Sequence, residues 1–151
     1  MKRLLIIGIS LLAVLSLSSC SKNPSDTLGD VQNLYKVDKH EEVKDYYTEG
    51  SIKAMEELKK LVPDSQKGGV EIDKKFVSGA IWEVIEEKID GDMAEIKIKY
   101  TDHPEENMKG LEITYNMKKE NGRWKIDMEK ELNESIKMIK GMNEKMNFFK
   151  Q

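Results

Sequence analysis

The sequence predicts an α+β fold, with helices first, an antiparallel meander sheet next and an extra C-terminal helix last. Changes in the spacing of apolar residues carry this prediction. They recur at helical spacing up to about residue 62, alternate with polar residues over most of residues 94–128, and then return to helical spacing. Turn chemistry agrees, because Asp90-Gly91-Asp92 and Asn121-Gly122 are signals for tight turns between strands.

Three helices are expected in the first half of the chain. The first has Asp26 or Thr27 as its N-cap, and the second is a short helix that includes residues 43–47. The third is capped by Ser51 and ends at Pro63, and residues 65–69 are expected to form a loop. The apolar faces of the three helices are, in order, Leu28, Val31, Leu34 and Tyr35; Val43, Tyr46 and Tyr47; and Ile52, Met55, Leu58, Leu61 and Val62.

Regular alternation predicts strands over residues 94–100, 111–119 and 123–128, in a sheet with one covered face. A further strand is expected around residues 82–89, and residues 102–110 are a longer polar connection. The side chains expected on the covered face are Ala94, Ile96, Ile98 and Tyr100; Leu111, Ile113, Tyr115 and Met117; and Trp124, Ile126 and Met128.

The tail, residues 129–151, is predicted to be an amphipathic helix. Its apolar stripe is Leu132, Ile136, Ile139, Met142, Met146 and Phe149. The helix either folds back over the sheet and buries this stripe, or offers it to a partner, since methionine adapts to varied surfaces. We expect the first arrangement.

Residues 1–19 have the parts of a secretory signal peptide. Lys2 and Arg3 precede an uncharged run of residues 4–17, which is shorter than the roughly 20 apolar residues of a transmembrane helix. Leu17-Ser18-Ser19-Cys20 resembles the lipobox of bacterial lipoproteins, in which the signal is cleaved before the cysteine and its sulfur is lipidated. Cys20 has no disulfide partner, because the chain holds one cysteine. The alternative is an ordinary signal peptide cut near Ser19.

The lipobox resemblance implies a bacterial cell-envelope protein, anchored to the membrane by acyl chains such as palmitate on Cys20. Residues 20–26 are then expected to be the lipidated cysteine and its tether. In a cell with two membranes, Ser21 in place of an aspartate favours the outer membrane. The 28 acidic and 25 basic residues are mixed along the chain, which gives no basic face for nucleic acid.

Two segments resemble a known family: DGDMAEIKI at residues 90–98 and NGRWKID at residues 121–127, with a looser match at YYTEGS, residues 46–51. They are similar to bacterial lipoproteins of unknown function that have a nuclear transport factor 2-like domain, which has a cystatin-like α+β architecture. The resemblance covers about residues 27–128. It implies a curved sheet that wraps the helices into a cone, whose open end is often a pocket, and the superfamily includes both enzymes and binding modules.

The residues expected around such a pocket are Trp82, Ile98, Tyr100, Ile113 and Tyr115, although core packing would also explain them. An inward tyrosine hydroxyl could polarise a substrate carbonyl, but the strand faces that carry Tyr100 and Tyr115 have no acidic residue to act as a base.

The two histidines, His40 and His103, lie in charged segments and are expected to be exposed. The acidic residues at 102–106 match neither zinc nor calcium spacing, so no metal or other cofactor is expected.

The expected function is therefore that of an envelope-anchored, non-catalytic module. Its partners would be the membrane, through lipid on Cys20, and a small ligand or an envelope protein. The alternatives are an isomerase- or hydratase-like enzyme that uses the cone pocket, and a purely structural envelope protein.

Overall fold

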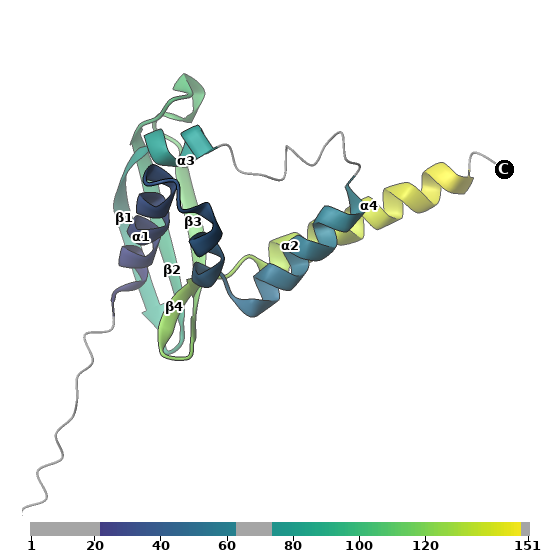
Figure 1. Cartoon of the computed structure of the whole chain (residues 1–151), viewed down its shortest axis with the longest axis horizontal. Coiled ribbons are helices and arrows are strands. Elements are labelled where there is room, and N and C mark those ends of the chain that lie inside the picture. The colour runs from purple at the N-terminus through teal and green to yellow at the C-terminus, as the bar shows by residue number, and fades with distance from the viewer. Residues whose placement is uncertain (1–21, 63–73, 149–151) are drawn as a thin grey trace, which may run out of the picture.

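The computed structural model of the chain describes residues 22–62 and 74–148. The predicted α+β class is confirmed, because helices come first, a four-stranded antiparallel sheet follows, and a helix comes after the sheet (Figure 1). The expectations for the signal peptide, for Cys20 and for the loop at residues 65–69 lie outside the described residues.

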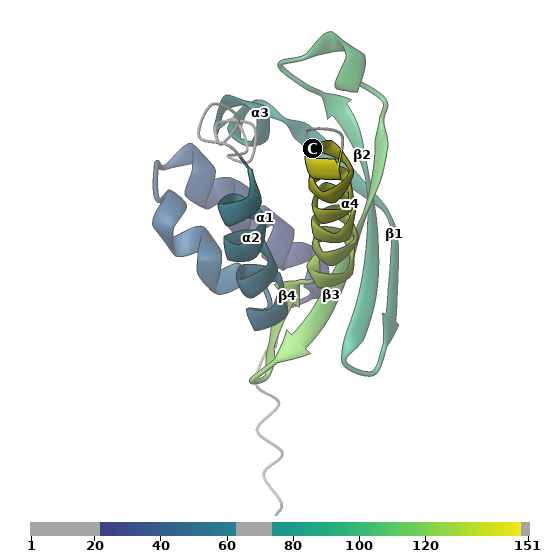
Figure 2. The same cartoon turned by 90° about the vertical axis from the view of Figure 1, so that its right-hand side faces the viewer.

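The four strands lie side by side in chain order and form a curved sheet (Figure 2). They are β1 (Ile81–Asp90), β2 (Met93–Asp102), β3 (Glu112–Glu120) and β4 (Arg123–Ile126). The predicted alternation is clearest in β2, where Ala94, Ile96, Ile98 and Tyr100 are buried. The glycines of the two tight turns, Gly91 and Gly122, have φ of 59° and 76°, which side-chain-bearing residues rarely adopt.

Helix α1 (Pro24–Lys36) and the 3₁₀ helix η1 (His40–Tyr46) cover the buried face of the sheet. Leu28 and Val31 of α1 and Val43 of η1 enter one core cluster with side chains from the strands, which include Ile96, Ile98, Met117, Trp124 and Ile126. Burial of one such apolar side chain is worth about 1.5–3 kcal/mol. These contacts therefore hold α1 and η1 on the sheet.

The expected tether is too long at its C-terminal end, because α1 begins at Pro24 and takes in residues 24–26. The Asn23 backbone N–H donates to the Asp26 carboxylate at 3.0 Å, which is one half of a capping box. Proline is well suited to the first helical position, where its missing N–H leaves no hydrogen bond unmade. The Asn-Pro pair therefore starts a helix within the segment that was expected to be the tether.

The expectation that the tail folds back over the sheet was also wrong. Helix α4 (Glu129–Phe148) packs along α2 (Glu49–Leu61), and the two project from the sheet as a pair of parallel helices (Figures 1 and 2). Ile136 is buried, and Lys140 forms a 2.7 Å ion pair with Glu57 of α2. Because α1 and η1 already cover the sheet, the apolar stripes of α2 and α4 are left to bury each other.

Leu111 does not lie on the covered face, as the alternation had suggested. It precedes β3 and is 43% exposed, at the end of the β2–β3 connection that holds the 3₁₀ turn η3 (Glu106–Met108). Its carbonyl accepts a 3.0 Å hydrogen bond from the Tyr100 backbone N–H. The backbone of Leu111 is therefore tied to β2, while its side chain faces solvent.

Candidate functional site

A cavity of about 290 Å³ lies between α1 and the covered face of the sheet. All five residues that the sequence predicted for a pocket line it: Trp82, Ile98, Tyr100, Ile113 and Tyr115. The other lining residues come from α1, from the residue that follows η1, from residues 77 and 80 ahead of β1, and from the end of β4 and the connection after it. They are Leu28, Val31, Gln32, Tyr35, Tyr47, Val77, Ala80, Ile126 and Met128.

Strand register explains why the five predicted residues meet. Trp82 of β1 lies opposite Tyr100 of β2, and Ile98 of β2 lies opposite Ile113 of β3. Residues that face each other across neighbouring strands project to the same side of the sheet. The period-2 pattern therefore placed these side chains on one face, and the pairing of the strands brought them to one cavity.

Tyrosines supply most of the polar groups of the cavity wall. The hydroxyls of Tyr100 and Tyr115 are close enough to interact. Burial, reinforced by this neighbour, holds the pKa of Tyr115 well above its usual value, and burial raises the pKa of Tyr47 to about 12. Burial also raises the pKa of Tyr35. The hydroxyls of Tyr35, Tyr47 and Tyr115 are therefore neutral at physiological pH and can donate or accept a hydrogen bond there.

A short helix that the sequence analysis did not anticipate closes one end of the cavity. In α3 (Lys74–Gly79), the carbonyl of Val77 accepts a 3.1 Å hydrogen bond from the side-chain amide of Gln32 in α1. The same amide nitrogen donates to the carbonyl of Ala80. Gln32 thereby links α3 to α1, and both N–H groups of its amide are used in these hydrogen bonds.

The described lining residues of the cavity include no carboxylate, imidazole, ammonium or guanidinium group. Glu87 projects toward the covered side of the sheet, because an irregularity between Val84 and Glu86 changes the alternation of β1 and places Glu87 opposite Ile96. Its carboxylate accepts hydrogen bonds from the backbone N–H and the hydroxyl of Ser25, at 3.3 and 3.0 Å. Glu87 thus binds the N-terminus of α1 and is not part of the cavity wall.

Both histidines were expected to be exposed, and both expectations were wrong. His103 is 6% exposed, with its ring 5.0 Å from that of Tyr100, and its Nδ1 accepts a 3.0 Å hydrogen bond from the Glu105 backbone N–H. The side chain of His40 is partly buried, bonds to the Asp38 carboxylate, and has its ring 5.2 Å from that of Tyr35. Each histidine ring therefore packs against a tyrosine of the cavity wall. Neither is a cavity-lining residue.

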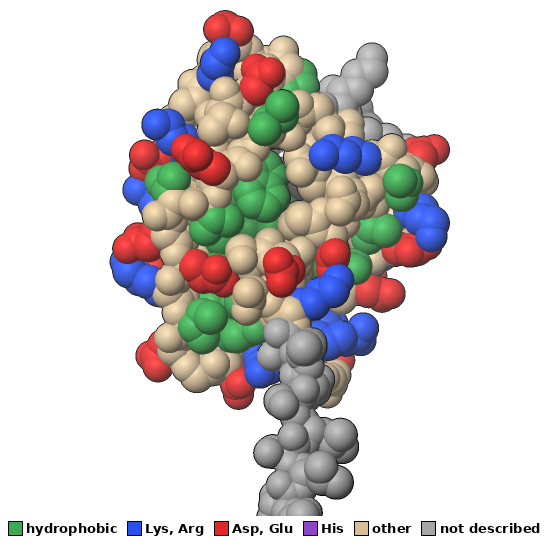
Figure 3. All heavy atoms as spheres, turned by 90° about the vertical axis from the view of Figure 1, so that its left-hand side faces the viewer, with side chains coloured by type: hydrophobic (Ala, Val, Ile, Leu, Met, Phe, Trp, Pro, Cys, Tyr) green, Lys and Arg blue, Asp and Glu red, His purple; other side chains and the backbone are tan. Residues whose placement is uncertain are grey.

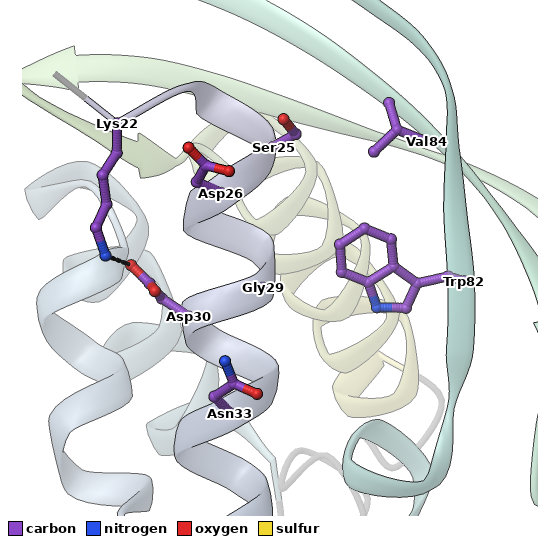
Figure 4. A pocket seen from close by; sticks show the side chains of 8 residues that line it. All are labelled: Lys22, Ser25, Asp26, Gly29, Asp30, Asn33, Trp82 and Val84. Atoms are coloured by element: carbon purple, nitrogen blue, oxygen red, sulfur yellow. Dashed lines mark hydrogen bonds and ion pairs between the residues drawn. The ribbon is translucent and has the colours of Figure 1, made fainter. Parts of the chain in front are cut away.

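A second hollow, a shallow groove of about 510 Å³, lies outside the cavity between α1 and β1 (Figure 4). Polar side chains of the α1 region form one wall, and Trp82 and Val84 of β1 form the other. Figure 3 shows the hollowed face of the molecule with apolar side chains inside it and acidic and basic ones around it. This groove could not be predicted from the sequence, because it depends on how an edge strand and a helix meet.

The anchor predicted at Cys20 lies outside the described residues, and Lys22 is the first residue that the structure describes. Within the described ranges, no helix is long and apolar enough to cross a bilayer. In the same ranges, no three His, Cys, Asp or Glu side chains are grouped closely enough to hold a metal ion.

Comparisons of the chain with protein-family models, with curated proteins and with solved structures find no match.

Proposed function

We propose that this chain is a lipid-anchored protein of the bacterial cell envelope whose α+β domain binds a small, largely apolar ligand. The single observation that carries the binding role is the cavity under α1, whose described lining is aliphatic and aromatic apart from tyrosine hydroxyls and Gln32. Small-molecule sites are typically concave and mostly apolar, with a few polar groups that orient the ligand. The volume of about 290 Å³ is close to the lower end of the usual range.

The cavity favours binding over catalysis. General acid–base catalysis requires a titratable group within hydrogen-bond reach of the reacting atoms. The tyrosines could polarise a carbonyl. The raised pKa of Tyr115 keeps its hydroxyl protonated near neutral pH, so no tyrosinate is available there as a general base. We therefore assign Tyr100 and Tyr115 the role of orienting a ligand through hydrogen bonds.

The anchored location is supported by the lipobox sequence at residues 17–20. It is tested by growing cells with an alkyne analogue of palmitate and isolating the protein. The wild-type chain should be labelled and should fractionate with membranes, and the Cys20→Ala chain should be unlabelled. Equal labelling of both chains, or a Cys20→Ala chain that is still held by membranes after its signal is removed, would contradict lipid anchoring through Cys20.

Binding is tested with the full-length chain that carries Cys20→Ser and with the neutral fluorescent probe N-phenyl-1-naphthylamine. Two variants fill the cavity from opposite sides, Ala80→Leu and Ile113→Phe. Ile89→Phe adds a similar bulk on β1 at a side chain that is 55% exposed, and serves as the matched control. We expect a fluorescence rise that saturates with the parent chain and with Ile89→Phe, and at least about tenfold weaker binding to both cavity variants.

The circular dichroism of all four chains shows whether each variant is folded. No saturable binding to the folded parent, or equal binding to all folded variants, would rule out the cavity as the binding site.

A protein-binding role remains the second candidate because of α4. Met138 and Met142 of α4 are 67% and 50% exposed, so they are accessible to a partner. A photo-crosslinking amino acid at Met142 should capture one discrete envelope protein in intact cells. The same amino acid at Glu134, an exposed position of α4, should not; equal capture at both positions would argue against a specific surface.

A further inference from the structure

Trp82 lines both the cavity and the α1–β1 groove. In Figure 4 its indole ring projects from β1 toward α1, across from Gly29. The irregularity in pairing between Ile81 and Trp82 fits this position, because such irregularities re-aim a side chain next to a site. A ligand that reached from one hollow into the other would therefore pass this ring.

The helix side of the groove is open opposite the indole. Ser25, Gly29 and Asn33 follow each other at intervals of four residues, so they lie along one face of α1. Gly29 has no side chain, and a Cβ built there meets no described atom within 4 Å. The helix surface is thus bare at the centre of the groove, with a polar side chain on either side of the gap.

The two hollows differ in polarity. The inner one is apolar apart from the tyrosine hydroxyls and Gln32, whereas the groove is bordered by hydroxyl, amide and charged side chains. The charged ones are Lys22, Asp26 and Asp30, which leave one negative charge in excess, and Lys22 is paired with Asp30. The face of an indole ring attracts cations as well.

We propose that the cavity and the groove are two compartments of one binding site, and that the occupant is an amphiphile with a cationic head group. Its apolar part lies in the cavity, its head lies in the groove above Gly29, and Trp82 stands between the two and selects the head group. This inference rests on the proposed binding function and adds the class of the ligand. Trp82, which lines both hollows, carries the inference, and the net negative charge of the groove favours a cationic head group.

The test uses three compounds that share one octyl chain: octyltrimethylammonium, octanol and octanoate. Each displaces N-phenyl-1-naphthylamine from the full-length Cys20→Ser chain at low ionic strength. A cation over an aromatic face is worth about 0.5–2 kcal/mol, or roughly 2- to 30-fold in affinity. We therefore expect octyltrimethylammonium to bind at least about threefold more tightly than octanol, and octanoate to bind more weakly than either.

Two variants that change the charge of the groove in opposite directions should change the head-group preference in opposite directions. Lys22 and Asp30 are surface residues paired with each other, so replacing either should leave the fold intact. Lys22→Gln should increase the preference for the ammonium compound over octanoate, and Asp30→Asn should decrease it. Trp82→Leu keeps an apolar wall, removes the aromatic face, and should lower the preference for the ammonium compound over octanol.

Gly29→Leu places a side chain in the groove itself. Leucine is favoured over glycine in a helix, and the space beyond Gly29 is open, so the variant should be stably folded. We expect it to bind octyltrimethylammonium no better than octanol, while Gly29→Ala, the control, keeps most of the preference. The fluorescent probe, which has no cationic head, should still bind to both variants.

The outcomes separate this inference from the proposed function. Equal affinities for the three compounds, or preferences that none of the groove variants changes, would overturn the two-compartment site while leaving the cavity as a binding site. Failure of every compound to displace the probe from a folded chain would overturn both.

A cationic amphiphile could come from solution or from the membrane. Lys22 at the rim of the groove is two residues from Cys20, which is about 7 Å of extended chain. Phosphatidylcholine vesicles are therefore preloaded with dodecyltrimethylammonium. The lipidated wild-type chain, anchored to these vesicles, is compared with the unanchored Cys20→Ser chain mixed with the same vesicles. Faster loading of the anchored chain identifies the bilayer as the source, and equal loading of both identifies the solution.

Discussion

The hydroxyl of Thr48 donates a 3.1 Å hydrogen bond to Oδ1 of Asp127, which lies 79 residues further along the chain. Thr48 is the N-cap of α2, and Asp127 directly follows β4. Ser51, which is fully buried, joins them: its hydroxyl lies 2.7 Å from that of Thr48 and accepts a 2.8 Å hydrogen bond from the Met128 backbone N–H. This polar cluster fixes the point at which the parallel helices α2 and α4 leave the sheet.

Removing the carboxylate of Asp127 should destabilise this junction. Asp127→Ala leaves the hydroxyls of Thr48 and Ser51 without their acceptor in a largely buried place, which costs about 1–3 kcal/mol of unfolding free energy. Asp127→Asn keeps an acceptor oxygen and should cost clearly less. Urea unfolding of the three chains measures the difference, and equal stability of all of them would show that the cluster is not structurally important.

The placement of Leu111 can be checked by comparing it with Met117. Both were expected on the covered face, but Met117 is fully buried and Leu111 is 43% exposed. Met117→Ala should cost about 2–5 kcal/mol, as truncations in a core do, and Leu111→Ala should cost less than about 1 kcal/mol. Similar large losses of unfolding free energy in both variants would show that Leu111 is a core residue.

Two glycines should respond in opposite ways to alanine. A methyl group at Gly29 meets open space within a helix, so Gly29→Ala should stabilise the protein by about 0.5–1 kcal/mol. A Cβ at Gly79 would lie 2.6 Å from Cγ of Pro104, whose ring cannot move aside freely, so Gly79→Ala should be destabilising. Thermal unfolding of both variants gives the signs, and a destabilised Gly29→Ala would contradict the open groove.

Stability should fall at alkaline pH because of the buried tyrosines. Burial raises the pKa of Tyr47 to about 12, from about 10 in the unfolded chain, so the unfolded chain releases this proton first. The contribution of Tyr47 to the free energy of unfolding is therefore complete below about pH 10 and is lost as the pH rises toward 12. It is of the order of 2–3 kcal/mol.

Tyr47→Phe should make the unfolding free energy less dependent on pH in this window. Urea unfolding between pH 9 and 11.5 provides the measurement. An unchanged slope would mean that Tyr47 ionises as readily in the folded protein as in the unfolded chain.

The sequence predicted the strands and the cavity residues for the same reason. Alternation with period 2 assigns each side chain to a face, so Ile98, Tyr100, Ile113 and Tyr115 could be placed together before their contacts were known. The burial of His103 could not be foreseen, because it depends on a polar connection that packs against α3 through Pro104 and Gly79.

The position of α4 shows a second limit. Its apolar stripe revealed that the helix needed a partner, but not that α2 would provide it. Selection among several apolar faces depends on where the chain leaves the sheet, which the Thr48–Asp127 contact determines. The groove was missed for a related reason, since it arises from an edge strand and from a glycine that the pattern did not distinguish.

The central claim, a ligand site in the tyrosine-lined cavity, is tested most directly by methyl NMR of the full-length Cys20→Ser chain with labelled isoleucines. N-phenyl-1-naphthylamine is added, and each methyl shift is followed. We predict saturable changes at the cavity residues Ile98, Ile113 and Ile126, with little change at the exposed Ile85 and Ile89. Changes confined to Ile85 and Ile89, or no change at any isoleucine, would contradict the claim.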